Sequence, residues 1–209
     1  MTLRPFDPAD PIRPLREFVV AMTELVDRTR DEPELLARGR ELLAGLIADD
    51  RWLPEACSRA EPGAYRQYLL HCDPLERFSV VAFAWGPGAR TPVHDHTVWG
   101  LVGVMRGAER CREWSPEGPG RVVDRGHEHV MRAGAIEAVS PTVGDWHVVS
   151  NDLPDADSVS IHVYGANIGA VRRHRLDPSS GEILEFVSGY SSPTVPNLWD
   201  RSGTARTAP

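Results

Sequence analysis

The chain has 209 residues, enough for one domain of ordinary size, and its 23 Lys and Arg against 30 Asp and Glu give a net charge of −7. This charge and the lack of a basic block argue against nucleic acid and anionic membranes as partners, so we expect a small-molecule partner. Its three cysteines, Cys57, Cys72 and Cys111, are an odd number without a C-x-x-C pair, which argues against a disulfide framework and a thiolate zinc site.

The sequence also bears on localisation. The first ten residues, MTLRPFDPAD, lack the basic and apolar regions of a signal peptide, and no apolar stretch approaches the length that spans a bilayer. Together with reduced thiols, this predicts a soluble, cytoplasmic protein.

Two helices are predicted in an N-terminal helical segment, residues 1–62. Apolar residues between positions 15 and 26 follow the i, i+3, i+4, i+7 spacing of an amphipathic helix. A second helix begins near Pro33, which suits a first-turn position, and its apolar period continues to Ile47.

From residue 63 the pattern changes to short β-type runs punctuated by Gly, Pro and Asp. Many short strands without alternating helices predict a mainly β fold, a sandwich or barrel, over residues 63–190. A Pro-rich, irregular tail is expected over residues 191–209. The predicted strands are 65–71, 78–85, 98–106, 109–114, 129–133, 136–139, 158–164 and 182–187.

The segment 91–100 contains His94-Asp95-His96 in a stretch that reads as β-strand. Side chains two residues apart leave the same face of a strand, so His94 and His96 can reach one metal ion while Asp95 points away. An ordinary pair of surface or core histidines is the alternative. A third histidine in the pattern Gly144-x2-His147-x3-Asn151 favours the metal site.

Residues 158–164 alternate strictly, with Ser160, His162 and Tyr164 on one face and three aliphatic residues on the other. Periodicity alone favours a half-buried strand whose polar face meets water. If that face instead turns into the barrel, the three polar groups must satisfy one another by hydrogen bonds.

Taken together, these motifs resemble the cupin superfamily, a small β-barrel of the jelly-roll type, although many cupins carry a Glu where this chain has Gly100. The H-D-H-T pair, the third histidine and the Ser-x-His-x-Tyr strand resemble the thiol dioxygenases within that superfamily, over about residues 63–176. These enzymes use non-haem Fe(II) and O2 to convert a thiol to a sulfinic acid. The resemblance implies Fe(2+) as cofactor, bound by His94, His96 and His147. It also implies a Ser160–His162–Tyr164 relay beside the substrate.

Two departures from the mammalian-type cysteine dioxygenases resemble the bacterial 3-mercaptopropionate dioxygenases. Gln67 stands where the former have a carboxylate-binding Arg, and Gly100 and Leu101 stand near the position of the Cys that crosslinks to the Tyr. The resemblance implies that Arg173 holds the substrate carboxylate and that Gln67 lines the pocket. The alternatives are another thiol, such as L-cysteine, cysteamine or mercaptosuccinate, and a non-redox metal-binding cupin, an isomerase or a sensor.

Two other features are interpreted as structural. His127-x-His129 lies in a polar, charged stretch and is predicted to be a surface loop or hairpin without a third metal ligand. Cys111, on a predicted strand, is expected to be buried and unreactive.

Overall fold

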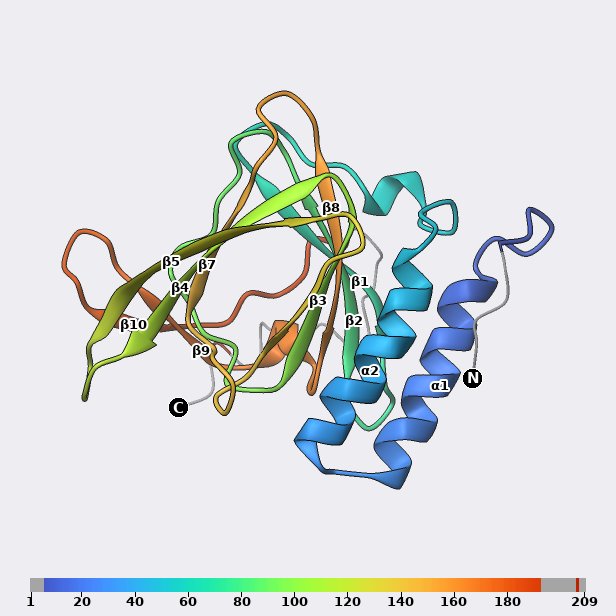
Figure 1. Cartoon of the computed structure of the whole chain (residues 1–209), viewed down its shortest axis with the longest axis horizontal. Coiled ribbons are helices and arrows are strands. Elements are labelled where there is room, and N and C mark those ends of the chain that lie inside the picture. The colour runs from blue at the N-terminus through green and yellow to red at the C-terminus, as the bar shows by residue number, and fades with distance from the viewer. Residues whose placement is uncertain (1–5, 193–205, 207–209) are drawn as a thin grey trace.

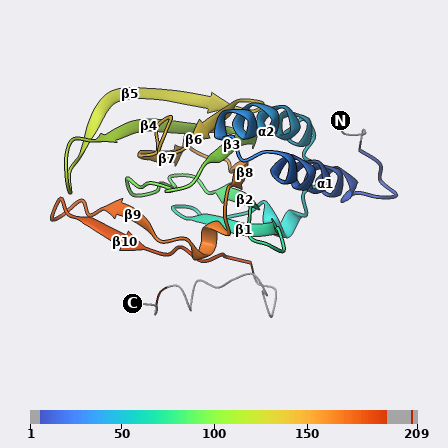
Figure 2. The same ribbon diagram turned by 90° about the horizontal axis from the view of Figure 1, so that it is seen from below.

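The computed structural model of the chain describes residues 6–192 and residue 206. Two antiparallel helices, α1 (Arg13–Arg28) and α2 (Glu32–Ile47), lie side by side against one wall of a β-barrel (Figures 1 and 2). A short 3-10 helix, η1 (Glu55–Cys57), leads from them into the first strand. Both predicted helices are confirmed.

Local sequence explains where α2 begins and how it packs. The side chain of Asp31 accepts a hydrogen bond from the backbone N–H of Glu34 at 3.1 Å, which satisfies one of the free donors of the first turn. Gly39 then faces the sheet, where a Cβ would lie 2.9 Å from a methyl group of Leu101. The absence of that side chain lets the helix approach the barrel closely, and the apolar stripes of both helices join one core with the outer face of the sheet.

The wall under the helices is a five-stranded antiparallel sheet with the order β1-β2-β8-β3-β6. Its strands are β1 (Tyr65–Cys72), β2 (Ser79–Trp85), β3 (Gly100–Arg106), β6 (Ile136–Val139) and β8 (Ser158–Tyr164).

The opposite wall contains a three-stranded sheet and a hairpin. The sheet has the order β5-β4-β7, and the hairpin pairs β10 with β9. Between β7 and β9 runs the segment around His94, which forms antiparallel bridges with His147 on one side and Arg175 on the other. This short segment therefore completes the wall. The strands are β4 (Ala108–Pro116), β5 (Val122–Arg132), β7 (His147–Asn151), β9 (Arg173–Leu176) and β10 (Ile183–Phe186).

This is the mainly β, cupin-type barrel that was predicted, with its helices packed outside, but two details differ. The prediction missed β7 and β9. His94 and His96 precede β3 in a segment held by isolated bridges and not in a continuous strand. His127 and His129, predicted in a surface loop or hairpin, lie on the long strand β5, which forms an antiparallel hairpin with β4, so the hairpin interpretation is confirmed.

Every residue of β8 is buried. The outer, aliphatic face of the strand packs under the helices, and the inner, polar face points into the barrel. The half-buried interpretation of this strand is therefore wrong. Both faces are covered because α1 and α2 shield the side that would otherwise meet water.

In the described part of the chain, no helix is both long enough and apolar enough to cross a membrane. The predicted irregular tail, 191–209, lies for the most part outside the described residues.

Candidate metal centre and surrounding pocket

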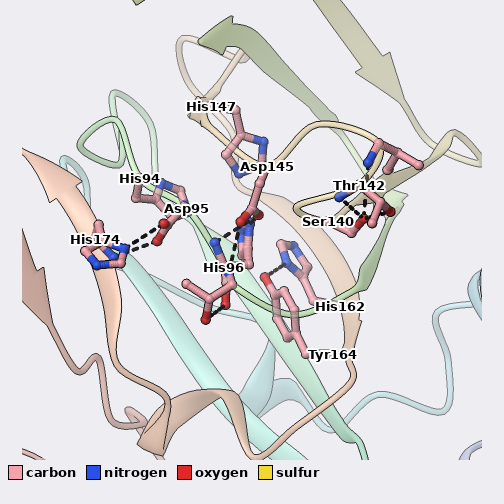
Figure 3. Close-up of polar contacts among 12 residues, drawn as sticks. His94, Asp95, His96, Ser140, Thr142, Asp145, His147, His162, Tyr164 and His174 are labelled. Atoms are coloured by element: carbon pink, nitrogen blue, oxygen red, sulfur yellow. Dashed lines mark hydrogen bonds and ion pairs between the residues drawn. The ribbon is translucent and has the colours of Figure 1, made fainter. Parts of the chain in front are cut away.

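Three histidines meet inside the barrel. His94 and His96 come from the segment between β2 and β3, and His147 begins β7 (Figure 3). Their ring centroids lie 4.9–5.0 Å apart, and one ring nitrogen of each lies within 4.8 Å of the others. The structure thus brings together the three histidines that the sequence proposed as ligands.

Backbone pairing fixes two of the three histidines. The N–H of His94 donates to the carbonyl of His147 and the N–H of His147 donates to the carbonyl of His94, each at 3.0 Å. On the other side of this segment, the N–H of Leu176 donates to the carbonyl of Val93 at 2.9 Å. One short segment is therefore held between two strands, and it presents His94 beside His147.

The Nδ1 atoms of all three rings have outer partners. His94 Nδ1 lies 3.0 Å from the carbonyl of Pro92, which can only accept, so this nitrogen carries the proton. His96 Nδ1 lies 2.9 Å from Asp145 Oδ1, and His147 Nδ1 lies 3.6 Å from Cys111 Sγ. A proton on Nδ1, directed at the Pro92 carbonyl and the Asp145 carboxylate, leaves the Nε2 lone pairs of His94 and His96 for a metal, as outer partners of metal-binding histidines commonly do.

Asp145, which the sequence analysis did not single out, organises the turn after His96. Its carboxylate accepts hydrogen bonds from the backbone N–H groups of His96 and Thr97, both at 2.9 Å, as well as from the His96 ring. Thr97 has a φ of 61°, a left-handed conformation that costs a β-branched residue on the order of 1 kcal/mol or more. These hydrogen bonds stabilise that conformation and aim the His96 ring into the barrel.

Burial keeps the cluster neutral. It lowers the pKa of His94 and His96 well below the ordinary value, with the neighbouring His147 adding to the effect, and it lowers the pKa of His147 to about 4. The contact between His96 and Asp145 is accordingly a hydrogen bond of a neutral ring and not an ion pair. Neutral imidazoles are metal ligands, and three of them without a protein carboxylate fit a divalent transition metal that keeps open coordination positions.

Asp95 points away from the cluster, as predicted. Its carboxylate accepts from the backbone N–H of His174 at 2.6 Å and contacts the His174 ring at 2.7 Å (Figure 3). This pair ties the histidine-bearing segment to β9. Asp95 is therefore an anchor for the site and does not contact it.

The inner face of β8 forms a continuous row of hydrogen bonds. Ser160 Oγ lies 2.8 Å from His162 Nε2, and His162 Nδ1 lies 2.8 Å from the Tyr164 hydroxyl. Trp85 Nε1 donates to Ser160 Oγ at 3.1 Å, and the Phe83 ring stacks on His162 at a centroid distance of 4.1 Å. The row is buried, and burial holds the pKa of His162 down at about 3.

Tyr164 connects this row to the histidine cluster. Its ring stacks on the His96 ring at a centroid distance of 5.4 Å. Gly100 lies opposite Tyr164 in the β3–β8 register, and a Cβ there would be 2.8 Å from Tyr164 Cδ1 and 3.0 Å from Val139 Cγ2. The tyrosine ring thus fills the space that a side chain at position 100 would need, so a glutamate there is excluded by packing.

The far end of the row reaches a buried carboxyl group. Glu109 on β4 has no exposed surface, and its Oε2 is without a hydrogen-bond partner among the described residues. Ser158 Oγ lies 3.2 Å from Oε1 but also 3.0 Å from the carbonyl of Arg106, and its single proton serves one of them at a time. Burial outweighs the help of Ser158 and Ser160 and raises the pKa of Glu109 to about 7.

A small cavity joins these groups, with a volume of about 40 Å³. The three histidines, Tyr164 and His162 line it, and so do Gln67 and Arg173. The Gln67 side chain donates to the carbonyl of Gly189, which places its amide at the wall.

Arg173 is the one cationic side chain among the described residues that line this cavity, and it is 5% exposed. One guanidinium nitrogen donates to Ser188 Oγ at 2.6 Å, and the group lies 4.7 Å from the Phe186 ring centroid. Among the described residues its Nε has no hydrogen-bond partner, and none of their carboxylates forms an ion pair with it. Because a buried charge without a counter-ion is costly, this arrangement favours an anionic ligand.

Each site residue proposed from the sequence therefore borders this cavity or the hydrogen-bonded row behind it. Asp145 and Glu109 were missed. Asp145 lies two residues before His147, a spacing that would have suggested a shared role. Nothing local to Glu109 distinguishes it from the other acidic residues of the chain.

No protein-family model matches this chain. Among solved structures, a protein with a double-stranded β-helix domain from Klebsiella pneumoniae is 18% identical, covers 54% of this chain and 80% of its own, and gives a TM-score of 0.42. A cupin superfamily protein from Desulfitobacterium hafniense is 8% identical, with 52% and 83% covered and a TM-score of 0.39. An oxalate oxidase bound to the substrate analogue glycolate is 16% identical, with 54% and 57% covered and a TM-score of 0.42. The chemistry of this chain therefore rests on its own residues.

Proposed function

We propose that this protein is a non-haem Fe(II) thiol dioxygenase that converts a small carboxylated thiol, preferentially 3-mercaptopropionate, and O2 to the sulfinic acid. The observation that carries the proposal is the buried Ser160–His162–Tyr164 row, which ends in a phenol stacked beside the three histidines. A site that only bound a metal would not need this row. A reaction that moves protons and oxygen next to the metal would use it.

His94, His96 and His147 would hold the iron through their Nε2 atoms. Bound iron would activate the substrate thiolate and O2. Both oxygen atoms would pass to the sulfur, which would lose the four electrons that O2 gains. The reaction needs no external reductant. The outer partners of the histidines keep each ring oriented for this role.

The hydrogen-bonded row would set where the Tyr164 proton points. Trp85 Nε1 donates to Ser160 Oγ, and the single Ser160 proton can go to Glu109 or to His162 Nε2; in the reaction proposed here it goes to His162. The neutral His162 then carries its proton on Nδ1 and donates it to the Tyr164 oxygen. This leaves the Tyr164 hydroxyl proton to be donated into the cavity, toward substrate or oxygen atoms in the transition state.

The residues that line the cavity support a negatively charged substrate. Arg173 offers a planar guanidinium whose Nε is free for a carboxylate, and Gln67 adds an amide on the wall. Among the described residues no Asp or Glu lines the cavity. A substrate ammonium would therefore lack a counter-ion beside Arg173, which favours 3-mercaptopropionate over L-cysteine and cysteamine. The small cavity favours a thiol with few heavy atoms.

The test is O2 consumption by protein loaded anaerobically with Fe(II), with 3-mercaptopropionate, L-cysteine, cysteamine and mercaptosuccinate offered in turn and sulfinate detected by mass. We expect the highest kcat/KM with 3-mercaptopropionate. A preference for L-cysteine would retain the reaction and change the substrate. No uptake with any thiol, despite bound iron, would reject the reaction and favour a non-redox metal-binding role.

A further inference from the structure

A second group of metal-ligating side chains lies outside the three-histidine cluster. Cys111 on β4, His129 on β5 and Glu137 on β6 each offer one ligand atom within 4.8 Å of the others. Cys111 and His129 are directly opposite in the β4–β5 register. Glu137 Oε1 is already in hydrogen-bond contact with His129 Nε2. Three different strands thus bring a thiol, an imidazole and a carboxylate to one place.

Burial makes this cluster closed on one side and reachable from the other. Cys111 is 3% exposed, whereas the side chains of His129 and Glu137 are 28% and 35% exposed. His129 Nδ1 is buried and has no hydrogen-bond partner in the described part of the chain. Because buried polar atoms are nearly always paired, Nδ1 is a ring nitrogen that is available to a ligand, whereas Nε2 already contacts Glu137.

The surrounding charges favour a cation. Along the same face of β4 and β5, Glu113 Oε1 contacts His127 Nδ1 at 2.8 Å, and these two residues form an overlapping group with His129. A cation that entered along this face would meet acceptor groups from the surface to the thiol.

We propose that Cys111, His129 and Glu137 form a second metal site, for a borderline-soft divalent cation such as Zn²⁺. A thiolate, an imidazole and a carboxylate are all ordinary zinc ligands, and three protein ligands leave a fourth position for water or another ligand. The inference does not depend on thiol oxidation. Cys111 Sγ lies 3.6 Å from His147 Nδ1, so the second site shares a contact with the first.

Cobalt is a suitable probe, because a Co²⁺–thiolate bond has a charge-transfer absorption that an all-nitrogen site lacks. Metal-free protein would be titrated with Co²⁺, and stoichiometry and the absorption would be recorded. The variant His94→Ala/His96→Ala removes the first site, and Glu137→Gln and His129→Ala weaken the second. Cys57→Ser is the matched control, since Cys57 is the thiol that is only partly buried.

We expect wild-type protein to bind two Co²⁺ per chain. The variant His94→Ala/His96→Ala should bind one Co²⁺ per chain and should keep the thiolate absorption. Glu137→Gln and His129→Ala should each weaken that binding by at least about 100-fold. Loss of an outer partner of a metal ligand already costs up to about 100-fold, and these two residues are proposed as direct ligands. Circular dichroism would verify that each variant is folded. One Co²⁺ per wild-type chain, or no thiolate absorption in His94→Ala/His96→Ala, would overturn the proposal. Loss of the absorption in Cys57→Ser would overturn it as well.

Discussion

The buried carboxyl group of Glu109 predicts a dependence of stability on pH that one substitution should remove. In the folded chain its pKa is raised to about 7 from an ordinary value of 4.5, because the group is fully buried and its Oε2 has no partner among the described residues. The variant Glu109→Gln keeps the shape and a hydrogen-bonding amide but cannot ionise. Any part of the pH dependence that comes from this carboxyl should therefore be absent in the variant.

The sign and size follow from proton linkage. Because the folded-state pKa is the higher one, the folded chain keeps the proton between pH 4.5 and 7 while the unfolded chain has lost it. The stabilisation is present below pH 4.5 and is lost as the pH rises through 7. For a group with these two pKa values, the free energy of unfolding is lower by about 2–3 kcal/mol at pH 8 than at pH 5.

Urea unfolding of metal-free wild-type protein and Glu109→Gln at pH 5 and pH 8 measures this term, since all other titrating groups are common to both chains. We expect the variant to gain about 2–3 kcal/mol relative to wild type between the two pH values. Glu182→Gln, at an exposed position, is the control and should give no such gain. A difference between wild type and Glu109→Gln that is the same at both pH values would refute this reasoning.

Four further predictions concern the site. Tyr164→Phe should keep metal affinity and slow sulfinate formation by about 100-fold or more, and unchanged turnover would remove the row from the mechanism. Arg173→Gln should lower kcat/KM for carboxylated thiols by about 10- to 100-fold, with cysteamine much less affected; an equal loss for both would exclude carboxylate binding. Gly100→Ala, whose Cβ would lie 2.8 Å from the Tyr164 ring, should lower stability by about 1–3 kcal/mol in thermal unfolding; an unchanged melting temperature would contradict the packing. Asp145→Asn should weaken metal binding by about 10- to 100-fold in competition with a chelator, and full affinity would show that the carboxylate acts on the backbone alone.

The parts of the site that were predicted from sequence have local signals. Ser160, His162 and Tyr164 alternate along one strand, and the period of two places them on a common face wherever that strand lies. Whether this polar face is buried depends on the helices. They cover the opposite, aliphatic face of the strand, so that the polar face lines the interior of the barrel. The sequence contains the two apolar stripes of those helices, but nothing in it says which sheet face they cover.

The structural details that the sequence did not predict depend on contacts between distant segments. His94 acquires its position by bridging β7 and β9, two short strands with weak β-type signals of their own. The conformation of Thr97 depends on Asp145, 48 residues away. His129 appeared to lack a partner because Cys111 and Glu137 reach it from two other strands.

The central claim is that both atoms of O2 enter one thiol sulfur in this pocket. The most direct test supplies ¹⁸O2 to Fe(II)-loaded protein with 3-mercaptopropionate and measures the mass of the sulfinate formed in a single aerobic turnover. Two labelled oxygen atoms in each sulfinate, with one O2 consumed, is the result predicted here. A disulfide with reduced oxygen released to solution, or a sulfinate whose oxygen comes from water, would contradict the account.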